Sequence, residues 1–298
     1  MAFIEGDVSV NKIGIYYAYW CKDYDADFSY YASKVSKLDF DVFEVNADAV
    51  MNISSTARQN LKELIKKENL EMTFCMGLAN KYDISVADES IRRRGIDYLK
   101  RIIEMVSIMG GKKLSGILYA AWNPVLPERD FDKAAFTERS VESMKKVIKT
   151  AEDFGVYCNV EVVNRFEQFI LNTCKEAVDY VKMVDSPNIK ILLDTYHMNI
   201  EEDSIEDAII KAGNTLGHLH IGENNRKLPG QGGHIPWDEV VHGIKKINYE
   251  GNIVMEPFII PDGEVGRDIK VWRDMSIGID FDEKAKEALT FIREKLRN

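Results

Sequence analysis

Short apolar runs alternate along the chain with longer stretches in which apolar residues recur every three or four positions. Runs such as Leu216–Ile221 are continuously apolar apart from isolated polar residues, which is typical of parallel strands covered on both faces. In the longer stretches apolar residues share one helical face, as Leu61, Leu64 and Ile65 do between Ser54 and Lys67. The predicted strands span residues 13–18, 41–45, 71–76, 114–119, 156–161, 189–193, 216–221 and 252–255.

The predicted helices follow the strands one for one, so the pattern is a repeated strand and helix. They span residues 27–38, 54–67, 85–106, 133–154, 173–184, 204–213, 236–247 and 282–296. Ser85, Thr173 and Ser204 each precede an acidic residue by three positions, the spacing of a capping box at a helix start. Eight strands alternating with eight helices predict an α/β fold, a single-domain (β/α)₈ TIM barrel over residues 12–298. Residues 1–11 are expected to be an N-terminal extension.

Composition narrows the class of protein. The 298-residue chain has a formal net charge of −10 and only short basic clusters, which argues against a nucleic-acid partner. Its apolar runs are shorter than the roughly 18 residues needed to cross a membrane, so we expect no membrane association. The first seven residues lack the basic and apolar segments of a signal peptide. The four cysteines show no paired spacing, which predicts reduced thiols in a cytoplasmic protein.

Four predicted strands in the second half end on residues that can bind a metal ion. These residues are Glu161, Asp194, His220 and Glu256. The working residues of such barrels lie at the carboxyl ends of the strands, so the four side chains should meet at one rim. A carboxylate at a buried strand end is costly unless it is paired. Three carboxylates and one imidazole, without a thiolate, favour Mn²⁺, Co²⁺ or Mg²⁺ over a structural zinc site.

Several stretches of the chain resemble the ketose 3-epimerases, the group of D-tagatose and D-psicose 3-epimerases within the xylose isomerase-like TIM barrels. The resemblance covers nearly the whole chain from Lys12 onward. It is carried by residues 14–20 (GIYYAYW), 161–167 (EVVNRFE), 193–204 (LDTYHMNIEEDS), 217–223 (GHLHIGE), 254–258 (VMEPF) and 269–274 (IKVWRD).

This resemblance implies a role for each candidate residue. Glu161, Asp194, His220 and Glu256 would be the metal ligands, and Glu161 and Glu256 would also act as the acid and base on opposite faces of a ketose. The residues expected to bind the O1–O3 end of the sugar are Glu167, His197 and Arg226, and those expected to shape the pocket are Tyr16, Trp122 and Phe258. The family also implies a homodimer or homotetramer. Where strand four ends, residues 119–124 (YAAWNP) depart from the family pattern, as does Asn224, so the preferred ketose stays open.

Other readings are compatible with parts of the pattern. A sugar isomerase of the aldose–ketose or hydroxypyruvate type would use the same barrel and metal but move a carbonyl between C1 and C2. A metal-dependent nuclease of the endonuclease IV type would be expected to carry more histidines and a basic groove than this chain, which has five histidines. A non-catalytic sugar-binding module would not need the paired glutamates.

Overall fold

The computed structural model describes residues 11–126 and 131–298, so ten of the eleven residues assigned to the N-terminal extension lie outside the described residues. Eight parallel strands hydrogen-bond in chain order and close into a barrel, β1 pairing with β8. The predicted TIM barrel is thereby confirmed. The strands are β1 (Ile13–Tyr16), β2 (Val42–Asn46), β3 (Glu71–Leu78), β4 (Lys113–Ala121), β5 (Tyr157–Glu161), β6 (Ile189–Asp194), β7 (Leu216–Ile221) and β8 (Ile253–Met255).

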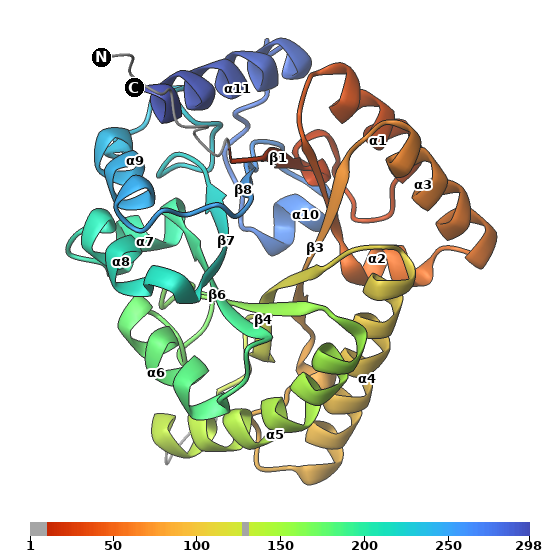
Figure 1. Ribbon diagram of the computed structural model, residues 1–298, viewed down its shortest axis with the longest axis vertical. Coiled ribbons are helices and arrows are strands. Elements are labelled where there is room, and N and C mark those ends of the chain that lie inside the picture. Colours follow the sequence, from red (N-terminus) through yellow and green to blue (C-terminus); the bar gives the residue numbers. More distant parts are fainter. Residues whose placement is uncertain (1–10, 127–130) are drawn as a thin grey trace, which may run out of the picture.

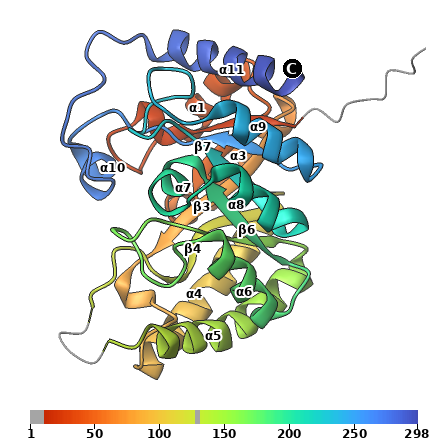
Figure 2. The ribbon, with the colours of Figure 1, turned by 90° about the vertical axis from the view of Figure 1, so that its left-hand side faces the viewer.

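Helices surround the barrel in the order of the strands (Figure 1), and Figure 2 shows the same ring from the side. Each main helix buries one apolar face against the strands. The helices are α1 (Phe28–Lys37), α2 (Ala47–Asn52), α3 (Ser55–Lys67), α4 (Glu89–Ile108), α5 (Lys133–Phe154), α6 (Cys174–Val184), α7 (Thr195–Glu201), α8 (Ile205–Ala212), α9 (Trp237–Lys246), α10 (Gly263–Asp268) and α11 (Phe281–Arg297). Within the described ranges, no helix is long and apolar enough to cross a membrane.

The predicted strands are all present, with ends that differ by at most two residues from those observed. Among the predicted caps, Thr173 forms a full capping box with Glu176, and the Ser204 side chain accepts from the Asp207 N–H. The cap predicted at Ser85 is wrong. Its N–H and hydroxyl both donate to Asp83, and α4 begins later, after Asp88, whose carboxylate accepts from the first turn. Three short helices, α2, α7 and α10, were not predicted.

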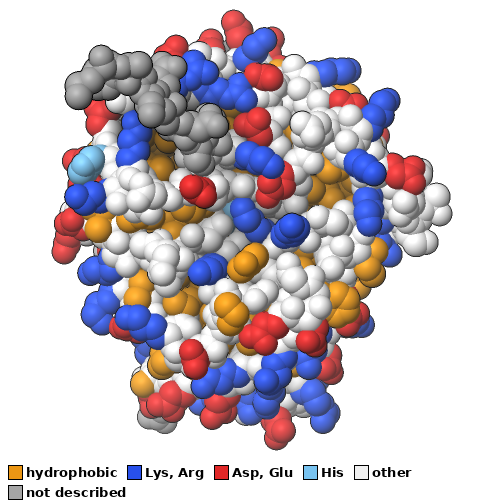
Figure 3. All heavy atoms as spheres, in the orientation of Figure 1, with side chains coloured by type: hydrophobic (Ala, Val, Ile, Leu, Met, Phe, Trp, Pro, Cys, Tyr) orange, Lys and Arg blue, Asp and Glu red, His pale blue; other side chains and the backbone are white. Residues whose placement is uncertain are grey.

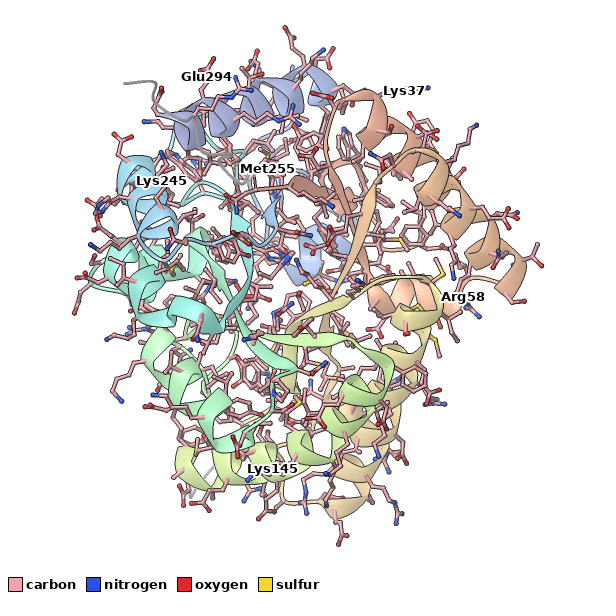
Figure 4. The ribbon with its side chains drawn as sticks, viewed as in Figure 1. Lys37, Arg58, Lys145, Lys245, Met255 and Glu294 are labelled. Atoms are coloured by element: carbon pink, nitrogen blue, oxygen red, sulfur yellow. The ribbon has the colours of Figure 1, made fainter. Side chains whose placement is uncertain are left out.

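Charged side chains lie mainly on the outer surface and apolar ones inside. In Figure 4, Lys37, Arg58, Lys145, Lys245 and Glu294 lie on the outer helices, whereas Met255 of β8 lies inside the ring. Figure 3 shows acidic and basic side chains interspersed over one face of the molecule. All four cysteines are buried and free, as the sequence predicted.

The seam between the first and last strands is reinforced by the two residues that precede β1. Asn11 is buried, and its side-chain amide donates to the carbonyls of Tyr249 at 2.7 Å and Gly251 at 3.0 Å. The backbone N–H of Ile253 donates to the Lys12 carbonyl. These bonds hold the start of the barrel against its last strand.

Candidate metal centre and substrate pocket

The four residues at the predicted strand ends meet in space. Glu161 and Asp194 are the last residues of β5 and β6, His220 lies on β7, and Glu256 directly follows β8. Asp194 and His220 are register partners across neighbouring strands. Each of the four offers a ligand atom, and these atoms all lie within 4.8 Å of one another, so the cluster could hold a metal ion. All four side chains are buried.

The His220 ring presents a free nitrogen to the carboxylates. Its Nδ1 is buried and without a hydrogen-bond partner among the described residues, 3.6 Å from Glu256 Oε1 and 3.9 Å from Glu161 Oε1. An orphaned imidazole nitrogen facing two carboxylates is a donor arrangement that suits a divalent cation. Burial alone would lower the pKa of His220, but Glu44 and Glu256 outweigh it and raise the pKa to about 10. A cation bound at Nδ1 would therefore displace a proton.

The two glutamates of the cluster are shifted toward their protonated forms. Burial is the largest cause for both. It raises the pKa of Glu256 to about 7, against the opposing effect of His220. Burial and the nearby Glu256 charge together raise the pKa of Glu161 well above its ordinary value. A carboxyl group with a pKa of about 7, as Glu256 has, is suited to giving and taking protons at physiological pH.

The buried guanidinium of Arg226 compensates the carboxylates. Its Nη1 donates to Asp194 Oδ2 and to Glu256 Oε2, both at 3.1 Å, and its Cζ lies 3.7 Å from the centre of the Tyr196 ring. Arg226 has a left-handed backbone (φ 65°), fixed by its N–H, which donates to Glu223, and by its carbonyl, which accepts from Phe258. The resemblance to the ketose 3-epimerases predicted Arg226 at the substrate site, and the structure places it in the lining of the cavity described below.

Glu167 lies in the loop after β5 and is held on both carboxylate oxygens. The indole N–H of Trp122 donates to Oε2 and the side-chain amide of Asn164 donates to Oε1, both at 3.0 Å. Burial alone would raise the pKa of Glu167, but His197 and Arg226 outweigh it and lower the pKa. Glu167 is therefore an ionised, fixed hydrogen-bond acceptor.

His197, on α7, is fixed as a donor toward the carboxylates. The backbone N–H of Asn164 donates to its Nδ1 at 3.2 Å, so the proton of the neutral ring lies on Nε2. That atom lies 3.7 Å from Glu161 Oε1 and 3.8 Å from Asp194 Oδ2. Burial lowers the pKa of His197, which keeps the ring neutral.

A cavity opens above this cluster, and only two of the four cluster residues lie in its lining. Glu161 and Glu256 line the cavity, whereas Asp194 and His220 do not. The six residues predicted to bind the sugar or shape the pocket all line it: Tyr16, Trp122, Glu167, His197, Arg226 and Phe258. The sequence did not single out the other side chains of the lining, which are Tyr24, Asn46, Cys75, Met76, Ile117, Val163 and Ile269. Tyr16 and Phe258 pack edge to face, with ring centroids 6.0 Å apart.

The cavity continues outward into a second hollow, with Tyr24, Asn46, Gly77 and Trp122 lining both. Four acidic residues line the outer hollow, and among the described residues its lining includes neither lysine nor arginine. These acidic residues are Asp25, Asp48, Glu264 and Asp268.

Sequence reasoning missed one buried carboxylate beneath the cluster. Glu44, in the middle of β2, has no exposed surface and lies against the Nε2 atoms of His218 at 2.9 Å and His220 at 2.7 Å. Burial alone would raise the pKa of Glu44, but the two imidazoles outweigh it and hold the pKa well below its usual range. The available signal was a charged residue interrupting an apolar strand.

The fold and the site define a xylose isomerase-like TIM barrel. The model of that family matches residues 32–294, and the chain belongs to the family. It is 45% identical over 290 residues to the D-psicose 3-epimerase of Ruminiclostridium cellulolyticum strain H10, covering 95% of this chain and 97% of that protein. It is 41% identical over 298 residues to the D-psicose 3-epimerase of Enterocloster bolteae, covering 98% of each.

Comparison with solved structures supports the same assignment as the similar sequences. The crystal structure of D-psicose 3-epimerase with D-tagatose from Clostridium cellulolyticum H10 superposes with a TM-score of 0.92 at 43% identity, covering 96% of this chain and 99% of that one. These relatives place the chain among the ketose 3-epimerases, as the sequence motifs predicted, and make it an enzyme of the isomerase class.

Proposed function

We propose that this enzyme is a metal-dependent ketose 3-epimerase that interconverts C3 epimers of free ketohexoses, D-fructose with D-psicose and D-tagatose with D-sorbose. The observation that carries the proposal is that only two of the four cluster residues, Glu161 and Glu256, line the cavity. The two glutamates face the substrate space, and both have raised pKa values. Asp194 and His220 lie behind them and have only the ligand role.

Each glutamate would act on one face of the sugar. The C3 proton of a ketose is acidified by the neighbouring C2 carbonyl, so one carboxylate can remove it to give a cis-enediolate. The other glutamate, in its acid form, returns a proton to the opposite face of C3. A pKa near 7 for Glu256 and a raised pKa for Glu161 support this exchange, because one group can be protonated while the other is ionised. The roles reverse in the reverse reaction.

The residues that would hold the metal ion are Glu161, Asp194, His220 and Glu256. A divalent cation, Mn²⁺ or Co²⁺ in our proposal with Mg²⁺ as the alternative, supplies Lewis acidity toward the substrate oxygens and so stabilises the enediolate charge. The absence of a thiolate from these four donors supports the choice of Mn²⁺ or Co²⁺.

Three further residues would bind the O1–O3 end of the sugar. His197 Nε2–H and the Arg226 guanidinium are donors for substrate oxygens, and the fixed carboxylate of Glu167 is an acceptor for a hydroxyl. Tyr16, Trp122 and Phe258 supply apolar walls, as small-molecule pockets usually require.

The acidic outer hollow supports a free rather than a phosphorylated sugar. The four carboxylates of its lining, of which only Asp268 forms an ion pair among the described residues, with Arg267, disfavour a phosphate dianion, whereas an uncharged ketose can hydrogen-bond to them. A cytoplasmic location and a homodimer or homotetramer remain predictions from the sequence.

The test is an epimerisation assay in D₂O on chelator-treated protein. D-fructose, D-tagatose and D-psicose are incubated with and without Mn²⁺ or Co²⁺, and the products are separated by chromatography. We expect the C3 epimer to form only with metal and to carry deuterium at C3. An aldose product with deuterium at C1 or C2 would instead establish the isomerase, and no product from any ketose would refute the proposal.

A further inference from the structure

Glu44 makes three contacts deep in the barrel, and its two oxygens are divided between them. Oε2 accepts from the Thr73 hydroxyl at 2.8 Å and lies 2.9 Å from His218 Nε2. Oε1 lies 2.7 Å from His220 Nε2. Thr73 is the register partner of Glu44 on the neighbouring strand β3, whereas both histidines come from β7 on the other side of the barrel. One oxygen is thus anchored, and the other is left for His220.

This arrangement determines which nitrogen of His220 faces the cluster. An ionised carboxylate only accepts hydrogen bonds, so the Nε2 atom beside it must carry a proton. The lone pair available to a cation is then on Nδ1, the atom that faces Glu161 and Glu256 and has no other partner among the described residues. With the opposite tautomer, Nε2 would present a lone pair to a carboxylate and Nδ1 would present a proton to the cation site.

We propose that Glu44 is a positioning residue, which holds the His220 ring so that Nδ1 can ligate a divalent cation together with Glu161, Asp194 and Glu256. Thr73 and His218 keep the Glu44 carboxylate in place for this purpose. The inference rests on the metal centre of the proposed function. It adds a residue from the first half of the chain that contacts neither substrate nor metal.

A carboxylate at this depth is costly unless it has a specific partner. The strand would be served equally well by an apolar residue, as at Val42, which lies two residues before Glu44 on the same face of β2 and is fully buried. Metal-ligating histidines commonly donate their second nitrogen to a carboxylate, which fixes ring orientation and raises ligand basicity. The pairing of Glu44 with His220 has this geometry.

The test is Mn²⁺ binding by Glu44→Gln, which keeps the shape of the side chain and removes its charge and one acceptor. Free Mn²⁺ is counted by electron paramagnetic resonance during titration of chelator-treated protein. We expect the dissociation constant to rise about 10- to 100-fold, the usual effect of removing such a partner. The nitrogen modulation that His220 gives to the spin echo of bound Mn²⁺ should weaken in parallel, a signature that general destabilisation would not produce.

Glu71→Gln is the matched control. Glu71 begins β3, at the opposite end of the barrel from the cluster, and pairs with Lys12 and Asn252. The same substitution there should leave the Mn²⁺ dissociation constant unchanged. Thermal unfolding in chelator shows whether each variant is folded.

The outcomes separate this inference from the proposed function. Wild-type protein that binds no Mn²⁺ would refute the metal centre itself and this inference with it. Wild-type binding with an unchanged dissociation constant in folded Glu44→Gln would overturn the role of Glu44 alone. If Glu44→Gln does not fold, Thr73→Val decides the question. Loss of its single hydrogen bond should raise the dissociation constant by about threefold or more, and an unchanged value would overturn the proposal.

Discussion

Replacing Arg226 by methionine should destabilise the metal-free protein, and a divalent cation should remove most of the difference. The guanidinium is buried, with 7% of the side chain exposed, and contacts Asp194 and Glu256 at 3.1 Å each. Methionine keeps most of the apolar length but leaves these carboxylates without their cation. A metal ion held by the same carboxylates would supply the missing positive charge.

The size of the effect follows from burial. Removing one partner of a buried ion pair costs about 3–5 kcal/mol, because an uncompensated charge stays behind. At about 2–4 °C per kcal/mol for domains of similar size, the melting temperature in chelator should fall by roughly 6–20 °C. Mn²⁺ at about 1,000 times its dissociation constant contributes about 4 kcal/mol. The variant should gain more than the wild type, because in the wild type Arg226 already compensates the charge of the two carboxylates that would hold the cation.

The assay is thermal unfolding of wild type and Arg226→Met, each in chelator and in excess Mn²⁺. Arg267→Met is the control, because that guanidinium is 66% exposed and lies 3.9 Å from Asp268, a pair worth about 1 kcal/mol or less. Arg226→Met melting with the wild type in chelator would show that the guanidinium does not compensate the carboxylates. A difference that Mn²⁺ leaves unchanged would show that the cation does not replace it.

Three further predictions concern catalysis and binding. Glu161→Gln and Glu256→Gln should each lower turnover by a factor of at least about 10²–10⁴ in the chromatographic assay, and a Glu256→Gln enzyme with most of its activity would contradict the two-carboxylate mechanism. Trp122→Phe removes the N–H that donates to Glu167 and keeps an aromatic wall. KM should rise about tenfold with little change in kcat, and an unchanged KM would show that this hydrogen bond does not orient Glu167. Because Glu256 has a pKa of about 7, it is protonated below that pH and must ionise to bind metal. The Mn²⁺ affinity should therefore fall from pH 8 to pH 6, and binding should release more protons at pH 6. Calorimetry in two buffers of different ionisation enthalpy measures both quantities. An affinity that does not depend on pH would contradict the raised pKa of Glu256.

The barrel could be predicted from the sequence because its strands are buried on both faces. Continuous apolar runs mark such strands, and β7 has the bounds that the sequence predicted. The short helices α2, α7 and α10 could not be predicted, because six or seven residues are too few to show helical periodicity. Ser85 has the spacing of a capping box, but Asp83 takes its hydroxyl, a local competition that spacing alone does not reveal.

The four cluster residues could be predicted to meet because parallel strands end at a common rim. Glu44 could not, because its partner His220 lies 176 positions away and no local motif links them. Arg226 lies in a polar loop that resembles an exposed turn, and its burial depends on carboxylates from β6 and beyond β8. Long-range pairing of charges is the part of the site that periodicity and spacing do not encode.

The metal-binding cluster and Glu44 come from different halves of the chain, so the site is complete only when the eight-stranded barrel is closed. The C-terminal half-barrel, β5 to β8, carries the complete donor set, yet the carboxylate facing His220 comes from β2 in the N-terminal half. Cutting the chain between the halves would give one fragment with the four donor residues and another with Glu44, the carboxylate that contacts His220. Fragment complementation would then restore metal binding only where the seams at β1–β8 and β4–β5 re-form, so recovered metal affinity would serve as a readout of barrel assembly.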